Sequence, residues 1–274
     1  MIAGMKDNES TEEGKIFQYM RVHWPSMVRE EWQVGDDEYP RILERVLADF
    51  TEGATLGRRM FRIAGQSGSG KTSQLLPGVE EWFDVREASP VLVAARRFVK
   101  YHPYEKEILE EYGRENIRKM TDEFSTILLF LTIKALIAKG YDIILDVTFL
   151  DVAVEEILMR MLVSGEYEVQ TTMVAVSRDI SDKHIKKRSG RVVAKKTADE
   201  FWRATGEAMQ FYAEKFPENR IILWNAWDVS PVYDGEFKGC LDIWRKYIEI
   251  VTFPENGVDE EKLREGKVRY FRGE

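Results

Sequence analysis

Apolar and polar positions follow two periods along the chain, and each change of period marks a predicted element. Short apolar runs rich in β-branched residues predict strands at 60–64, 91–95, 141–147, 169–177 and 220–225. Apolar residues at helical spacing predict helices between these strands, at 104–112, 116–139, 153–163, 179–187 and 197–216. Strands that alternate with helices are typical of an α/β fold, so we expect a parallel sheet with helices on both faces.

The same pattern predicts how the chain is organised. Residues 1–14 are polar and show no period, so we expect a disordered lead. Amphipathic stretches predict a helical N-terminal extension over residues 15–55. The core then spans residues 56–252 and includes a helical lid near 178–203. Residues 253–274 carry mixed charges and few apolar groups, which predicts a charged C-terminal tail.

Charge and hydropathy exclude several classes of protein. Lys and Arg number 40 against 48 Asp and Glu, and the net charge of −8 argues against a nucleic-acid-binding protein, whose surface would be basic. No apolar run approaches the roughly 18 residues that a membrane span needs. The start of the chain lacks signal-peptide features, and Cys240 alone cannot form an internal disulfide. We therefore expect a cytoplasmic protein without a membrane partner.

A glycine-rich motif follows the first predicted strand. It reads Gly65-Gln66-Ser67-Gly68-Ser69-Gly70-Lys71-Thr72, followed by Ser73, and it satisfies the pattern of a phosphate-binding loop, or P-loop. Glycines let successive backbone N–H groups face phosphate oxygens, Lys71 reaches the outer phosphates, and the Thr72 hydroxyl can bind Mg²⁺. The motif therefore predicts a nucleotide site on a sheet of the P-loop NTPase type. Pro77 and Gly78 predict that the following helix is short or interrupted.

A second metal ligand is expected at the end of a neighbouring strand. Asp146 ends the apolar run that begins at Tyr141, which brings a carboxylate to the edge of the sheet where α/β proteins bind ligands. We therefore assign Asp146 to the metal together with Thr72. The alternative is that Asp146 caps the next helix. Asp142, in contrast, is expected at the solvent-exposed start of the strand.

The third element is a basic segment. Residues 178–203 contain nine Lys or Arg and four Asp or Glu, a net charge of +5 within an acidic protein. Arg188 and Arg191 flank Ser189 and Gly190, a predicted break between helices, and we expect these arginines to stabilise the charge of a transferring phosphoryl group. The alternative is a solvated helix face, which we favour for lysines such as Lys183.

The order and spacing of three segments resemble the zeta-toxin family of P-loop kinases. The segments are Gly65–Ser73, Phe98–Pro103 and Ile144–Thr148, and the similarity extends over about Ile42–Tyr233. The resemblance implies a toxin of a toxin–antitoxin system that phosphorylates UDP-N-acetylglucosamine on a sugar hydroxyl, using ATP and Mg²⁺. It also implies a small helical antitoxin as partner.

The resemblance assigns further residues. Lys71 and Thr72 look like the family's phosphate lysine and metal-binding hydroxyl, and Arg188 and Arg191 look like its two phosphate-stabilising arginines. Asp146 falls where the family usually has a Glu that helps to hold the substrate.

Three more positions are assigned to substrate binding through the resemblance. Thr148 matches a family Thr, and His102 looks like a family residue, although a helix-entry histidine before Pro103 is the alternative that we favour. Arg96 stands where the family has its catalytic Asp, and Leu150 stands where it has an Arg.

Three functions remain open from the sequence. The first is an ATP-dependent kinase that acts on a hydroxyl of a small metabolite, such as a nucleotide sugar. The second is a nucleotide-binding pseudoenzyme or interaction protein, suggested by Arg96 in place of the family acid. The third is a hydrolytic NTPase, although such proteins commonly place a Glu beside the metal Asp, and here Val147 follows Asp146.

Overall fold

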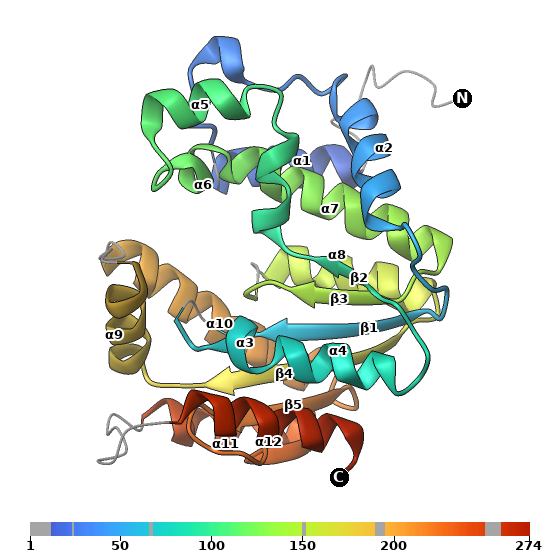
Figure 1. Ribbon diagram of the computed structural model, residues 1–274, viewed down its shortest axis with the longest axis vertical. Helices are drawn as coiled ribbons and strands as arrows, with labels where there is room; N and C mark the ends of the chain where they lie inside the picture. Colours follow the sequence, from blue (N-terminus) through green and yellow to red (C-terminus); the bar gives the residue numbers. More distant parts are fainter. Residues whose placement is uncertain (1–11, 24, 66–67, 150–151, 190–194, 250–258) are drawn as a thin grey trace. The chain divides into compact units, whose positions relative to one another are not determined.

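The chain forms two compact units, which Figure 1 shows as ribbons. The computed structural model describes residues 12–23, 25–65, 68–149, 152–189, 195–249 and 259–274. Unit 1 comprises residues 1–54 and 93–139, and unit 2 comprises residues 55–92 and 140–274. The segment 93–139 thus groups with the N-terminal helices, whereas the sequence placed it in the core of 56–252.

Unit 1 is helical. Its helices are α1 (Glu12–His23), α2 (Tyr39–Phe50), α5 (Glu105–Tyr112), α6 (Ile117–Met120) and α7 (Asp122–Lys139), with short 3-10 turns η2 (Glu30–Trp32), η3 (Ala95–Arg97) and η4 (Val99–Tyr101). Helix α1 begins inside the predicted lead, of which residues 1–11 lie outside the described part of the chain. The single helix predicted over 116–139 is divided at Thr121, where the backbone leaves the helical region.

Unit 1 is held together by aromatic contacts. The ring centroids of Phe17 and Tyr39 are 6.3 Å apart, and those of Tyr39 and Phe124 are 5.8 Å apart. These contacts join α1, α2 and α7. All three rings are buried, so the N-terminal helices share one apolar core with α7.

Unit 2 contains a six-stranded sheet. Its strands are β1 (Arg59–Ala64), β2 (Val91–Val93), β3 (Ile143–Asp146), β4 (Glu168–Ala175), β5 (Arg220–Asn225) and β6 (Tyr233–Glu236). The order is β2-β3-β1-β4-β5-β6. β1 pairs with β3 and β4 in parallel, and β4 pairs with β5 in parallel, as predicted. β6 pairs with β5 in the antiparallel sense and was not predicted, because Tyr-Asp-Gly-Glu has no apolar alternation.

Helices cover both faces of this sheet. They are α3 (Lys71–Gln74), α4 (Leu76–Asp84), α8 (Val152–Ser164), α9 (Arg178–Ser189), α10 (Lys195–Lys215), α11 (Phe237–Ile248) and α12 (Glu260–Arg272). As Pro77 predicted, the helix after the P-loop is interrupted, with α3 ending at Gln74 and α4 beginning at Leu76. None of the described helices has the length and apolarity that a membrane span requires.

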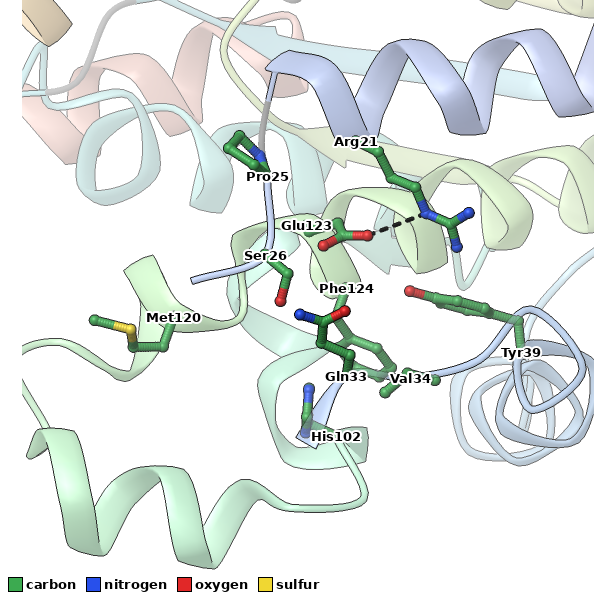
Figure 2. Close-up of a pocket in the computed structure, with 10 residues that line it drawn as sticks. All are labelled: Arg21, Pro25, Ser26, Gln33, Val34, Tyr39, His102, Met120, Glu123 and Phe124. Atoms are coloured by element: carbon green, nitrogen blue, oxygen red, sulfur yellow. Dashed lines mark hydrogen bonds and ion pairs between the residues drawn. The ribbon is translucent and has the colours of Figure 1, made fainter. Parts of the chain in front are cut away.

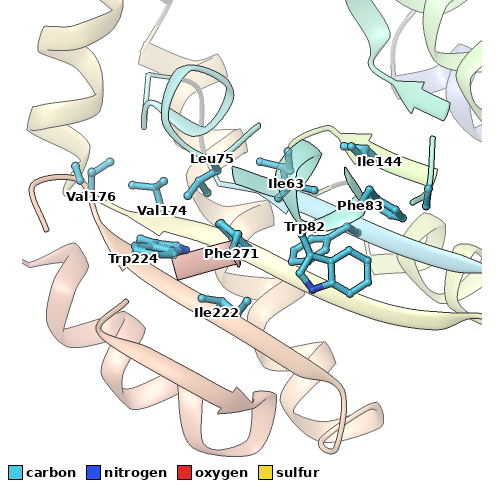
Figure 3. Packing of buried hydrophobic residues seen from close by; sticks show 14 of the residues in the cluster. Ile63, Leu75, Trp82, Phe83, Ile144, Val174, Val176, Ile222, Trp224 and Phe271 are labelled. Atoms are coloured by element: carbon cyan, nitrogen blue, oxygen red, sulfur yellow. The ribbon is translucent and has the colours of Figure 1, made fainter. Parts of the chain in front are cut away.

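One face of the sheet packs against α4 and α12. Phe61 of β1 and Trp224 of β5 pack against Phe271 of α12 in a buried cluster that also contains Trp82 of α4. Figure 3 shows Trp82, Trp224 and Phe271 in this cluster. The ring centroid of Phe271 is 5.7 Å from that of Phe61 and 5.8 Å from that of Trp224. Within the segment predicted as a charged tail, α12 is therefore a packed helix. Most of its charged side chains are exposed, whereas Leu263, Lys267 and Phe271 are buried.

The other face of the sheet contains a buried ion pair. Arg62 of β1 donates to both carboxylate oxygens of Glu155 on α8, and Tyr212 of α10 donates to the same carboxylate at 2.8 Å. Arg62 and Glu155 are at most 2 % exposed. A buried charge is tolerated only when it is paired and hydrogen-bonded, so this cluster fixes three elements relative to one another.

Asp142 corrects one expectation from the sequence. It was expected at a solvent-exposed strand start, but its side chain is fully buried. Arg59 Nη2 lies 2.6 Å from its Oδ2, and the Thr55 hydroxyl donates to the same oxygen at 2.8 Å. The prediction was wrong because a cation on the neighbouring strand compensates the buried carboxylate.

Candidate functional site

The P-loop leaves the end of β1 in the conformation that its glycines allow. Gly65, Gly68 and Gly70 have φ values of +122°, +79° and +87°, while Gln66 and Ser67 lie outside the described residues. A Cβ on Gly65 would stand 3.2 Å from the carbonyl oxygen of Val174 in β4. Only glycine combines this φ with so close an approach to the neighbouring strand.

Ser69 places an unsatisfied hydroxyl inside this loop. The residue is fully buried, and its Oγ finds no hydrogen-bond partner among the residues that the structure describes. A buried hydroxyl without a partner costs free energy, which a ligand oxygen in the loop would recover. The loop therefore carries a free donor where a phosphate-binding loop needs one.

Thr72 and Asp146 meet beside the loop. The Thr72 hydroxyl lies 3.0 Å from Oδ2 and 3.3 Å from Oδ1 of Asp146. The pairing of β1 with β3 sets Asp146 level with Ile63, two residues before Gly65, at the carboxyl edge of the sheet. Asp146 is 4 % exposed. It belongs to β3 itself, and α8 begins only at Val152, so its position disfavours the alternative role as a helix cap.

These two side chains fit a magnesium ion bound together with phosphates. A hydroxyl and a carboxylate are hard oxygen donors, and Mg²⁺ in phosphoryl-transfer sites takes one or two protein ligands and fills the rest of its shell with phosphate oxygens and water. The described residues contain no group of three or more His, Cys, Asp or Glu that would form an all-protein metal site. The fit therefore depends on a bound nucleotide.

The predicted lid is formed by α9 and α10. Arg188 lies in the last turn of α9, but its side chain is outside the described part of the chain, as is all of Arg191. Their assignment to the transferring phosphoryl group stays a prediction. At the other end of α9, Arg178 pairs with Asp199 of α10, and this ion pair joins the two helices. Within α9, Arg178 also lies 3.7 Å from Asp182.

His184 was not predicted as a site residue. Its Nδ1 lies 3.0 Å from the carbonyl oxygen of Gly68, so α9 contacts the P-loop directly. The His184 ring also meets Trp227, which follows β5, with centroids 6.2 Å apart. No motif or spacing marks a histidine for such a contact, because the P-loop lies 116 residues away in the chain.

The residues assigned to the substrate fall into both units. Arg96 is an exposed residue of η3 in unit 1. Thr148 is in unit 2, and its carbonyl oxygen accepts a hydrogen bond from Arg62 Nη2 at 3.4 Å. These assignments stay predictions.

His102 sits at the entry of α5. It is 5 % exposed, and its ring packs edge-on against Phe124 with centroids 4.6 Å apart. Its Nδ1 accepts a hydrogen bond from the backbone N–H of Tyr104 at 3.2 Å. Burial lowers the pKa of His102 to about 4. These contacts are those of a neutral histidine at a helix start, the alternative weighed from the sequence.

A cavity of about 380 Å³ lies beside His102 in unit 1, as Figure 2 shows. Arg21 Nε donates to Glu123 in its wall at 3.2 Å and also pairs with Asp36. The remaining lining residues are Pro25, Ser26, Gln33, Val34, Tyr39, Met120 and Phe124. The charged groups in the wall thus compensate one another.

The profile of the family described as Zeta toxin matches residues 58–237, a range that includes the P-loop, Asp146 and the lid helices. Toxin PezT of Streptococcus pneumoniae is 26% identical over 148 residues, which are 53% of this chain and 56% of PezT. The matched part thus spans about half the length of that toxin.

The fold is also found among solved structures. A chain from the characterised PezAT chromosomal toxin–antitoxin system of Streptococcus pneumoniae superposes with a TM-score of 0.65 and 21% identity, covering 90% of this chain and 100% of that chain. At this identity the likeness shows the fold, an α/β sheet with helices on both faces. Because the family profile matches well over half of the chain and includes the P-loop and Asp146, the protein belongs to the zeta toxin family.

Proposed function

We propose that the protein is an ATP-dependent kinase that transfers the terminal phosphoryl group of ATP to a hydroxyl of a small metabolite, in the manner of a zeta toxin. The acceptor we favour is a nucleotide sugar such as UDP-N-acetylglucosamine. The observation that carries the proposal is the contact of Thr72 with Asp146 beside a glycine loop whose Ser69 hydroxyl has no partner among the described residues.

Each part of this site has a role in phosphoryl transfer. The P-loop backbone and the Ser69 hydroxyl bind phosphate oxygens, and Lys71 neutralises the outer phosphates. Thr72 and Asp146 would hold Mg²⁺, which when bound supplies positive charge to the β- and γ-phosphates. Arg188 and Arg191 are assigned to the charge that spreads over the phosphoryl group as it leaves ADP.

The acceptor oxygen bonds to phosphorus as the bond from phosphorus to ADP breaks, and the proton of the acceptor hydroxyl passes to water. A loose transition state needs little help with this proton, because positioning and charge neutralisation lower most of the barrier. Arg96 in place of the family acid is therefore compatible with transfer. We assign to Asp146 the additional role of orienting the acceptor.

The test is phosphoryl transfer from labelled ATP. The wild type, incubated with Mg²⁺ and a bacterial metabolite extract, is expected to label one small product, and purified UDP-N-acetylglucosamine is expected to be labelled on its own. Lys71→Ala should abolish both reactions and weaken ATP binding, because it removes the loop cation that reaches the outer phosphates. Lys238→Ala, on an exposed turn of α11, is the matched control and should behave as wild type.

A nucleotide-binding protein without transferase activity is the second candidate, and Arg96 favours it. It predicts ATP binding that requires Lys71 but no labelled product from any extract component. A hydrolytic NTPase would instead release phosphate at the same rate with and without an acceptor. The three outcomes are distinct in one assay.

A small helical antitoxin is the proposed partner. The proposal rests on family membership and on the likeness to a chain of the PezAT system, which is described as a toxin–antitoxin system. Coexpression with the neighbouring open reading frame, followed by size-exclusion chromatography, tests it. A complex that lowers transfer to the acceptor would support the proposal, and two proteins that elute separately would contradict it.

A further inference from the structure

A buried lysine in the C-terminal helix contacts the segment that follows the P-loop. Lys267 of α12 is fully buried, and its Nζ donates to the Gln74 side-chain oxygen at 3.0 Å. Gln74 is the last residue of α3, two positions after Thr72. Helix α12 lies outside the range of the zeta toxin profile, so family membership does not account for this contact.

Gln74 is in turn packed against the loop itself. Its backbone N–H donates to the carbonyl oxygen of Gly70 at 3.0 Å. A Cβ on Gly70 would stand 2.9 Å from the Gln74 side-chain nitrogen, so the amide lies directly against the last glycine of the loop. The link from Lys267 through Gln74 therefore ends at the residue before Lys71.

Lys267 also holds a second segment at the same edge of the sheet. Its Nζ donates to the carbonyl oxygen of Asp228 at 3.0 Å, and it lies 5.4 Å from the ring centroid of Trp224. Asp228 follows the end of β5 and adjoins Trp227, which meets His184 of the lid helix α9. One ammonium group thus connects the turn after the P-loop with the loop after β5.

Packing alone does not explain a lysine at this position. The surroundings on α12 are apolar, with Leu263 and Phe271 buried on the same helix, and burial lowers the pKa of Lys267 to about 8. A methionine would fill a similar volume without the cost of burying an ammonium group. The benefit of the charge must therefore come from the groups that it orients.

We propose that Lys267 is a positioning residue of the nucleotide site, which holds Gln74 against the P-loop and fixes the loop after β5 beside it. The inference rests on the proposed function, because the P-loop is taken to bind ATP. It adds that the C-terminal helix, although remote in sequence, is part of the binding site. Lys267 acts through Gln74 and the Asp228 carbonyl.

The test compares ATP binding with folding stability. Isothermal titration with Mg²⁺ and ATP is expected to give a dissociation constant roughly tenfold higher for Lys267→Met than for the wild type, as loss of a hydrogen bond from a charged group predicts. The melting temperature without nucleotide should change by no more than about 4 °C. Lys262→Met, an exposed position on the same helix, is the matched control and should leave both quantities unchanged.

A double-mutant cycle separates positioning from a general effect on the fold. Gln74→Leu should raise the dissociation constant for ATP by a similar factor. The dissociation constant of the double variant should be no higher than that of either single variant. If Lys267→Met does not fold, Gln74→Leu alone still tests the link, since Gln74 is only half-buried. Unchanged ATP affinity in Gln74→Leu, or effects that add fully in the double variant, would overturn the inference.

The two proposals fail in different ways. If the wild type binds ATP, and Lys71→Ala does not, the nucleotide site stands whatever Lys267→Met shows. Wild-type affinity in Lys267→Met would then remove only the positioning role. A wild type that binds no ATP would overturn both.

Discussion

The Asp146 carboxylate is almost fully buried, and the Thr72 hydroxyl donates to it. Burying a carboxylate costs free energy unless its charge is compensated. A cation bound with the nucleotide would add to the compensation that the protein itself provides, which is consistent with the proposed role of Asp146 as a metal ligand.

Replacement of Asp146 by Asn should therefore separate activity from stability. We expect transfer to fall by roughly a hundredfold or more, because the variant loses the carboxylate that is proposed to hold Mg²⁺ and to orient the acceptor. The free energy of unfolding without ligand should change much less, since Asn has the volume of Asp and its side-chain oxygen can still accept the hydrogen bond from the Thr72 hydroxyl. Initial rates with Mg²⁺ and ATP, measured beside urea unfolding curves, check both. Transfer at the wild-type rate would contradict the assignment of Asp146.

His102 predicts a pH dependence of stability in unit 1. Its pKa is about 4 in the folded protein and near 6.5 when unfolded, so the unfolded chain binds more protons between these values. His102 by itself therefore makes stability rise with pH from about 4 to 6.5, by on the order of 3 kcal/mol. Desolvation raises the pKa of Asp122 to about 6, which acts in the opposite direction over the lower part of this window. Urea unfolding from pH 4 to 7 measures the slope.

His102→Asn is the matching variant, because its side-chain oxygen takes the position of Nδ1 and can accept from the Tyr104 N–H without titrating. Between pH 4 and 6.5 the stability of the wild type should rise more steeply with pH than that of the variant. If the variant keeps the full slope, another group is responsible for it.

At the scale of elements, α12 and α4 pack at unusually close range. Phe271 of α12 lies over Gly78 of α4, and Arg272 of α12 pairs with Glu81 of α4 at 2.7 Å. The start of α12 is capped by Asp259, which accepts from the N–H groups of Glu261 and Lys262. Because α3 and α4 follow the P-loop in the chain, the contacts between α12 and α4 stabilise the helices that support the loop.

Gly78→Ala tests this packing. Alanine inside a helix is favoured over glycine by about 0.5–1 kcal/mol, but a Cβ here would overlap the Phe271 ring, and overpacking costs about 1–3 kcal/mol. The cost of the overlap should exceed the gain from the helix preference, because Phe61 and Trp224 hold the Phe271 ring in place. We expect a lower melting temperature, which Phe271→Leu in the same chain should partly restore.

The control for this prediction is Gly206→Ala in α10. A Cβ there would meet its nearest neighbour, Trp244, at an ordinary 3.6 Å. It should stabilise the protein slightly through the helix preference alone. If Gly78→Ala stabilised the protein as much as Gly206→Ala does, the Phe271 ring would be able to move away without a cost in free energy, and the prediction would be wrong.

At the scale of the whole molecule, charge is unevenly distributed. The chain carries a net −8, yet residues 178–203 carry +5. A basic segment within an acidic protein favours the approach of anionic ligands to this part of the chain. This distribution suits a nucleotide and a phosphorylated acceptor.

Growth of a bacterial host reports on the activity of the entire protein. If it acts as a zeta-like toxin, induced expression should arrest growth, and Lys71→Ala at the same expression level should relieve the arrest. Colony counts together with immunoblots measure this. Arrest that persists in Lys71→Ala would point to a toxic mechanism other than phosphoryl transfer.

Local pattern alone determined the parallel strands, the P-loop and the position of Asp146. Each depends on neighbours in the chain: an apolar run forms a buried strand, a glycine motif follows it, and an acid at a strand end reaches the carboxyl edge. The interruption after Gln74 was predicted because Pro77 acts on the adjacent backbone.

Tertiary structure decided which charged residues are buried. Asp142 is buried because Arg59 on the next strand pairs with it, and Arg62 because Glu155 on α8 does. Lys267 reaches Gln74 across 193 residues of sequence. Whether such a group lies in solvent or in the core depends on a partner that no local pattern contains, because the free energy of a buried charge is set by the group that compensates it.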